Sequence, residues 1–168
     1  METFAQILGF IGLALAIVSF QSNRRRNILL FQLLAGTVFT LHFLLIGAYT
    51  GSLLNVIGVA RSAVFSFKGK KWADSRVWIG VFCAAMAVIG IFTWDGPASL
   101  LPTVAMMLTT VAFFLSNPTY IRRLNLPSSP MWMVYNLINR SYGGILTECF
   151  VMTSLLIAMF RFDRKKKV

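Results

Sequence analysis

The sequence is poor in acidic residues, cysteine and histidine. It contains five Asp and Glu residues together, two Cys and one His. The cysteines, Cys83 and Cys149, lie in apolar runs without a second thiol or a histidine cluster nearby, which argues against a disulfide framework and a zinc site. There is no Walker-type glycine loop, and one acidic residue lies within an apolar run. No catalytic, metal-binding or phosphate-binding set can be assembled, so we expect no enzyme, no metal and no cofactor.

Charged residues are also scarce for a soluble protein. They make up 12% of the chain, whereas a soluble domain has about 25%, and hydrophobic residues make up 57%. This composition indicates an integral membrane protein, whose main partner is the lipid bilayer.

The charge that is present is mostly basic, with a formal net charge of +11. A nucleic-acid-binding surface needs such residues on one solvated face, interleaved with contact groups. Here they lie between apolar runs. We therefore expect no nucleic acid partner, and we interpret the basic residues as determinants of membrane orientation.

Seven apolar runs are candidates for membrane spans. They are 4–20, 28–47, 52–67, 77–93, 99–116, 128–140 and 143–160. The first run has no basic segment before it and no small-residue cleavage site, so we expect a retained span rather than a signal peptide. The sixth is the weakest, with 13 residues, Pro127 before it and Pro130 in its first turn. Proline is tolerated at such a helix start.

Basic residues fall in alternate connections between these runs. Fourteen of the sixteen Lys and Arg residues lie in the first, third and fifth connections and in the tail. Because such residues collect on the cytoplasmic side, this pattern predicts an outside N-terminus and a cytoplasmic C-terminus. A six-span alternative without the short sixth run would place the basic tail outside.

Two stretches, 48–61 and 141–154, share a loose pattern and suggest an internal repeat. The pattern pairs Tyr49 with Tyr142, Gly51 with Gly144, and Asn55 with Glu148. Chance similarity between hydrophobic helices is the alternative, since the spacing from the basic connection to the Tyr-Gly turn differs by five residues between the halves.

The repeat predicts an all-α integral membrane protein with a single membrane domain. Seven transmembrane helices would form two parallel triple-helix repeats joined by a linker helix, in a 3-1-3 order. The predicted parts are 1–67 for the first repeat, 77–93 for the linker, 98–160 for the second repeat and 161–168 for a basic cytoplasmic tail.

Two local patterns resemble the YgjV family of bacterial inner-membrane proteins over most of the chain. They are SFQ at 19–21, followed by a basic connection, and GxLLNxIGxxR at 51–61. More distantly, the 3-1-3 order is similar to the PQ-loop group, which includes the SWEET sugar transporters. The Pro-Gln signature is degraded, because Gln21 has no proline before it and the second half has Asn-Pro at 117–118. The resemblance implies the inner membrane and a central pocket opened alternately to each side, but no particular substrate.

Polar side chains inside the apolar runs supply the candidate site. Asn55 and Glu148 each lie four residues below the glycine of a Tyr-Gly turn, at a depth of about 6 Å. His42 and Asn136 lie five residues below the outer ends of their spans. Intramembrane polar groups normally face the bundle interior. We therefore predict that these four side chains form one layer of a substrate-binding pocket.

Two aromatic residues next to Asn136, Trp132 and Tyr135, are predicted to offer stacking faces to a substrate. Arg61 lies nearer the cytoplasm and is interpreted either as a snorkelling anchor or as an inner-gate partner for a carbonyl or an anionic substrate.

Each of these residues also has a purely structural interpretation. Asn55 would cross-link helices, Glu148 would pair with Arg140, and His42 would be a hydrogen-bonded interior histidine. The two aromatic residues would serve packing or the membrane interface.

Two functions follow from this pattern. The first is a carrier or facilitator for a small neutral or weakly charged solute, working by alternating access of two triple-helix units. The alternative is a membrane receptor or assembly partner that binds a peptide end, a lipid or a protein helix without transport. Either would act as a monomer or a homodimer.

Overall fold

The computed structural model describes residues 2–163, and all regular structure in this part of the chain is helical. The main helices are α1 (Glu2–Gln21), α2 (Arg25–Leu45), α3 (Tyr49–Ser66), α4 (Val77–Phe92), α5 (Leu100–Phe114), α6 (Pro118–Asn125), α7 (Ser128–Ile138) and α8 (Tyr142–Ala158). A short 3-10 helix, η1 (Pro97–Ser99), precedes α5, and a π-helical turn, η2 (Met159–Asp163), continues α8. The predicted basic tail lies outside the described residues from position 164 onward.

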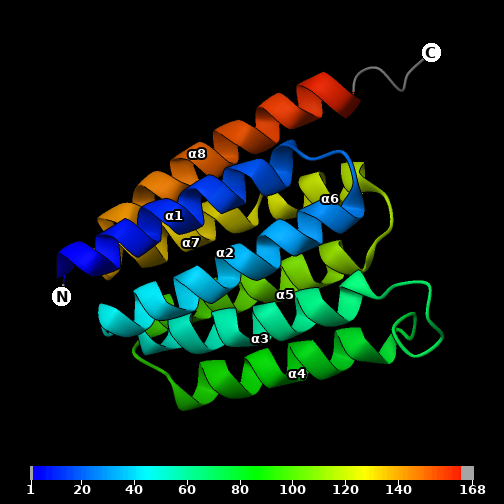
Figure 1. Cartoon of the computed structure of the whole chain (residues 1–168). Coiled ribbons are helices and arrows are strands. Elements are labelled where there is room, and N and C mark those ends of the chain that lie inside the picture. The colour runs from blue at the N-terminus through cyan, green and yellow to red at the C-terminus, as the bar shows by residue number, and fades with distance from the viewer. Residues whose placement is uncertain (1, 164–168) are drawn as a thin grey trace.

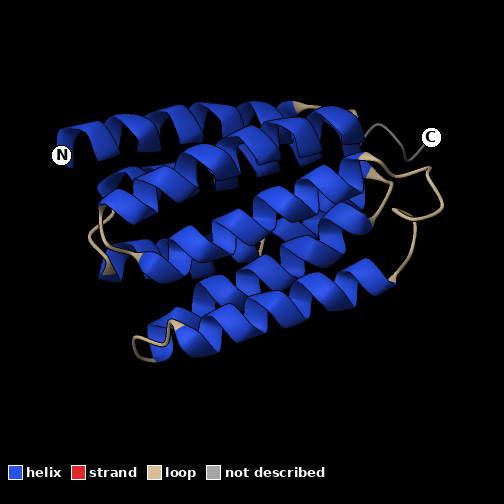
Figure 2. Cartoon of the chain, turned by 60° about the horizontal axis from the view of Figure 1, so that its bottom comes forward, coloured by secondary structure: helices blue, strands red, loops and turns tan. Residues whose placement is uncertain are grey.

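Six of these helices form a closed ring. In order around it, α1 packs against α2, α2 against α3, α3 against α5, α5 against α7, α7 against α8, and α8 against α1. Helix α4 lies outside the ring, against α3 and α5, and forms one edge of the bundle (Figure 1). The helices run side by side with their connections gathered at two ends (Figure 2). The α1–α2, α3–α4 and α5–α6 connections share one end, which we call the basic end (Figure 1).

Four helices are long and apolar enough to cross a membrane. They are Thr3–Gln21, Arg25–Leu45, Pro97–Phe114 and Tyr142–Asp163, with α4 as a shorter apolar helix. Helix α3 carries Asn55 and Arg61 within its 18 residues, and α7 has only 11 residues. The structure therefore supports a multi-pass helical protein, and the count of seven spans stays a prediction.

The helical segment at the predicted sixth span is longer than the sequence pattern indicated. Helix α6 was expected to be a connection, but Asn117 caps it by accepting a hydrogen bond from the Thr119 backbone N–H at 3.0 Å, and Pro118 occupies its first turn. Leu126 and Pro127, between α6 and α7, keep right-handed helical dihedral angles. The two helices thus form one segment over 118–138, interrupted where proline cannot donate a backbone hydrogen bond.

A basic residue at the start of α2 and another in the α3–α4 connection bind the C-terminal end of α5. Arg25 donates to the carbonyl oxygens of Leu115 and Phe113, both at 2.9 Å, and the Lys68 ammonium donates to the Phe114 carbonyl oxygen. A helix C-terminus leaves such carbonyls without partners and carries partial negative charge. Partial burial, together with the nearby Arg25 charge, lowers the pKa of Lys68. These cations therefore tie three connections together at the basic end.

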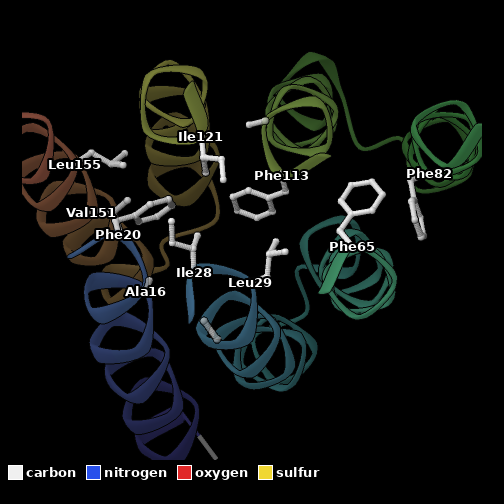
Figure 3. Close-up of a cluster of buried hydrophobic side chains, with 12 residues drawn as sticks. Ala16, Phe20, Ile28, Leu29, Phe65, Phe82, Phe113, Ile121, Val151 and Leu155 are labelled. Carbon is white, nitrogen blue, oxygen red and sulfur yellow. The ribbon is translucent and has the colours of Figure 1, made fainter. Parts of the chain in front are cut away.

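An apolar cluster fills the bundle near the basic end (Figure 3). Its buried members come from seven helices and are Ala16, Phe20, Ile28, Leu29, Ala35, Phe65, Phe82, Ala112, Phe113, Ile121, Val151 and Leu155. Lipid chains are as apolar as these side chains, so close van der Waals packing rather than the hydrophobic effect holds helices together within a bilayer. The edge-to-face pair of Phe65 and Phe82, with centroids 5.7 Å apart, attaches α4 to the ring.

A buried ion pair joins α6 to η2, the turn that continues α8. Arg122 of α6 and Asp163 of η2 are 2.5 Å apart, with side chains only 1% and 5% exposed. Asp163 also accepts a hydrogen bond from Thr119 at 2.8 Å. The neighbouring Arg123 is exposed. Two adjacent arginines that look equivalent in the sequence therefore have different roles.

This difference gives a matched test. We expect Arg122→Gln to destabilise the protein by about 3 kcal/mol, because it leaves the Asp163 carboxylate buried without its cation. The same change at Arg123 removes an exposed charge and should have little effect. Thermal unfolding of the two variants in the same detergent, followed by tryptophan fluorescence, measures the difference. Equal midpoints would show that the ion pair does not support the fold.

Candidate binding cavity

A cavity of about 110 Å³ lies inside the helix ring. Its wall includes residues of all six ring helices and one residue of α6. The polar and charged members of the wall are Gln32, Asn55, Arg61, Thr109, Asn125, Ser128, Ser129, Asn136, Thr147 and Glu148. The cavity therefore combines an apolar frame with a limited number of polar groups, as small-molecule sites do.

Apolar residues bound the cavity near both ends of the bundle. Toward the basic end, its wall includes Phe20 and Phe113 of the apolar cluster. Toward the other end, Phe43 of α2 and Trp132 of α7 reach across the ring and stack, with centroids 5.7 Å apart and an interplanar angle of 23°. The polar groups thus lie between two apolar barriers.

Asn55 reaches the cavity from α3 and has a free oxygen to offer. Its amide nitrogen donates to the Gly51 carbonyl one turn earlier, at 2.8 Å. Its Oδ1 atom has no hydrogen-bond partner among the described residues and is not fully enclosed. The Asn55 oxygen is therefore available to a donor inside the cavity.

Asn136 lines the cavity from α7, and its side-chain oxygen is also unpaired. Asn136 is 1% exposed, and its Oδ1 atom finds no partner in the described part of the chain. A Cβ atom at Gly144 would lie 2.6 Å from that oxygen. Glycine at 144 is thus required for α8 to approach the amide, and a buried unpaired oxygen is a costly feature that calls for an explanation.

Glu148 presents a carboxyl group from α8. It is half-buried and lines the cavity, with the Ser129 hydroxyl close enough to interact with it. It forms no ion pair among the described side chains. Arg140, its partner in the structural interpretation, is an exposed residue in a left-handed turn with φ of 51°. The carboxyl group therefore faces the cavity without a cation.

Arg61 brings a positive charge into the same cavity. It is 3% exposed, and its Nη1 atom donates to Thr109 at 2.8 Å, to Thr110 at 3.1 Å and to the Met106 carbonyl at 3.2 Å. The guanidinium also lies 4.7 Å from the centre of the Phe113 ring. Arg61 is thus fixed inside the bundle and does not extend to the basic end as a snorkelling anchor would.

The Arg61 charge has no carboxylate partner among the described side chains. Its Nε atom is buried without a hydrogen bond, whereas Nη2 is not fully enclosed and has no protein acceptor in the described part of the chain. A buried charge normally requires a counter-ion, since desolvation costs several kcal/mol per ion. The free edge of the guanidinium therefore remains available to an acceptor in the cavity.

Two predicted site residues lie outside the cavity wall. His42 is fully buried, with Nδ1 2.7 Å from the Ala5 carbonyl and Nε2 3.0 Å from the Ser141 hydroxyl, so its ring connects α1, α2 and the start of α8. Tyr135 accepts a hydrogen bond from the Gly51 backbone N–H at 3.2 Å. Both contacts match the structural interpretation of these residues. Trp132 does line the cavity, but one face of its ring is stacked on Phe43.

Several lining residues were not predicted from the sequence, notably Gln32, Thr109 and Ser129. A usable signal was present, because each is polar and lies in or beside an apolar run. Hydroxyl side chains are common in such runs, where they bond to the backbone of their own helix. Thr109 does this too, donating to the Met106 carbonyl at 3.0 Å while accepting from Arg61. That second role depends on α5 packing against α3.

Comparison with known proteins agrees with this description. The family model for a bacterial inner membrane protein, Imp-YgjV, matches residues 3–166. The inner membrane protein YgjV of Escherichia coli (strain K12) is 23% identical over 163 residues, which cover 97% of this chain and 86% of that protein. No solved structure matches the chain. The chain therefore belongs to the YgjV family of multi-pass bacterial inner membrane proteins.

Proposed function

We propose that this protein is a carrier or facilitator for a small solute, which it binds in the central cavity and releases to either side of the inner membrane. The observation that carries the proposal is the central cavity between two apolar barriers, with the unpaired Asn55 oxygen and Arg61 Nη2 atom on its wall. Such groups are costly in a membrane protein unless they serve a ligand or a pathway.

The pattern of helix contacts supports two triple-helix units in a 3-1-3 order. If α1, α2 and α3 correspond to α5, α7 and α8, then the α1–α8 contact corresponds to the α5–α3 contact, and both occur in the ring. Helix α4, the linker in this scheme, packs on the outside. These two equivalent helix contacts join the units around a cavity to which both contribute.

A matching pair of hydrogen bonds supports the same relation. Arg61 of α3 and Ser154 of α8 occupy equivalent positions in the proposed repeat. Arg61 donates to Thr109 of α5 at 2.8 Å, and Gln21 of α1 donates to the Ser154 hydroxyl at 2.9 Å. Polar contacts at equivalent positions thus hold each unit to the other.

The apolar barriers suggest how access would alternate. Separation of the apolar cluster would open the cavity toward the basic end, which we assign to the cytoplasm, and separation of Phe43 from Trp132 would open the other end. A receptor or assembly partner would need only one opening. The two barriers therefore favour a carrier, and the difference is measurable.

The orientation can be tested with reporter fusions. We expect green fluorescent protein at the C-terminus to fluoresce, because that end is assigned to the cytoplasm, and alkaline phosphatase inserted in the α4–η1 connection at Asp95 to be active outside. Active alkaline phosphatase at the C-terminus would reverse the orientation. An inactive insertion at Asp95 in a stable fusion protein would contradict the prediction that the α4–η1 connection and the C-terminus lie on opposite sides of the membrane.

Alternating access can be tested without knowing the solute. In a Cys83→Ser, Cys149→Ser background, Asn55→Cys should react with a membrane-impermeant methanethiosulfonate reagent in right-side-out and in inverted vesicles, because the cavity would open to each side in turn. Val56→Cys is the matched control, since Val56 is 45% exposed on the outer surface of α3. We expect no reaction there from either side.

Reaction of the Asn55→Cys protein in only one of the two vesicle types would exclude a carrier and favour the receptor. Reaction of the Val56→Cys control from both sides would mean that α3 does not separate a cavity from lipid, and would contradict the placement of the cavity.

A further inference from the structure

The cavity contains two ionisable side chains of opposite sign, Arg61 and Glu148, and the protein pairs neither of them with a counter-ion among its described side chains. They project from α3 and α8, which lie diagonally opposite each other in the ring. The charge of the cavity wall is therefore separated into a positive side and an acidic side.

The positive side is arranged to bind a carboxylate. The two N–H bonds of Nη1 are shared among three oxygen atoms of α5 and hold the Arg61 guanidinium in place, while Nη2 stays without a protein acceptor in the described structure. A guanidinium remains charged, and the N–H donors of Nη2 can form a charge-assisted hydrogen bond with a carboxylate. An anionic group on the ligand would supply the missing counter-charge.

The acidic side is arranged to bind a cation or a strong donor. The Glu148 carboxylate is acceptor-only when ionised, and the same cavity is lined by Asn136, whose side-chain oxygen is buried without a partner in the described structure. The Asn55 oxygen is also free. Glu148 and Asn136 thus belong to α8 and α7, whereas Asn55 reaches the cavity from α3, and no further cationic residue accompanies Arg61 in the described cavity wall. An ammonium group, which has three donors and no acceptor, satisfies such a set of oxygens.

From these two observations we infer that the ligand is a small zwitterion, whose carboxylate binds Arg61 and whose ammonium group binds Glu148 with the help of the asparagine oxygens. This inference rests on the proposed function and specifies its substrate class. A simple anion would leave the Glu148 side unsatisfied, and a simple cation would leave Arg61 unpaired. A neutral sugar would supply neither an anion for Arg61 nor a cation for Glu148.

The ligand class can be tested with probes that differ in one group each. Purified full-length protein in lipid nanodiscs should bind 4-aminobutyrate, β-alanine or glycine. The probe that binds most tightly reports the distance between the ammonium and carboxylate groups that the cavity prefers. The matching acid and amine of the best binder, for example butyrate and butylamine for 4-aminobutyrate, each lose one charged contact. We expect both to bind at least about tenfold more weakly, measured by calorimetry.

Two variants assign the ends of the ligand. Glu148→Gln should weaken binding of the zwitterion, so that the zwitterion no longer binds more tightly than the matching acid. Arg61→Gln should weaken binding of the zwitterion, so that the zwitterion no longer binds more tightly than the matching amine. Arg140→Gln, at an exposed arginine outside the cavity wall, is the matched control and should leave all affinities unchanged. If Arg61→Gln fails to fold, Arg61→Lys, which keeps the charge without the planar edge, should retain the zwitterion preference at reduced affinity.

Two results would overturn the inference. One is that no zwitterion binds more tightly than its matching acid and amine. The other is that the preference survives Glu148→Gln unchanged. Either result, combined with labelling of Asn55→Cys from both sides, would reject the substrate class and leave the carrier standing. Labelling from one side with a retained zwitterion preference would instead identify a zwitterion receptor.

Discussion

The buried Arg61 guanidinium is the constraint on which the arrangement of the central helices depends. A charge at this depth needs oxygen atoms around it, and the protein supplies them from one neighbouring helix, through Thr109, Thr110 and the Met106 carbonyl. This fixes α3 against α5, which is also a contact between the two proposed repeat units. The same contact leaves one edge of the guanidinium directed at the cavity, so stability of the bundle and charge of the cavity have a common origin.

Polar contacts between helices recur at the other positions where the ring closes. His42 connects α1 and α2 to the start of α8, and Gln21 connects α1 to α8 through Ser154. In a bilayer such contacts are individually modest, about 0.6 kcal/mol on average. Their value lies in specifying which helices are neighbours, because apolar surfaces alone pack against one another with little selectivity. The cavity exists because these contacts close a ring instead of a solid bundle.

Much of the helical organisation could be predicted from the sequence, because the length of each apolar run and the turn residues beside it determine where a helix begins and ends. The runs at 4–20, 28–47 and 143–160 correspond closely to α1, α2 and α8. Helix α6 was missed because its polar residues resemble a connection, and its membership of the sixth segment depends on dihedral angles around Pro127. Asn55, Asn136 and Glu148 were predicted to line a pocket from their similar depth below the outer ends of their spans, and all three line the cavity. The position of His42 between α1 and the start of α8, away from the cavity wall, could not be predicted. The rotation of a helix about its axis is set by neighbouring helices, which depth in the membrane does not identify.

The interruption between α6 and α7 has a mechanical consequence. Pro127 and Pro130 cannot donate backbone hydrogen bonds, so the carbonyls of Arg123 and Leu126 lack their usual helical donors. The segment is therefore least stiff between its two halves, both of which pack on α5. In addition, α6 is joined to η2 by the Arg122–Asp163 pair, and α7 packs on α8. Bending at this hinge would move α6 and η2 together against the apolar cluster while the wall formed by α7 stays in place.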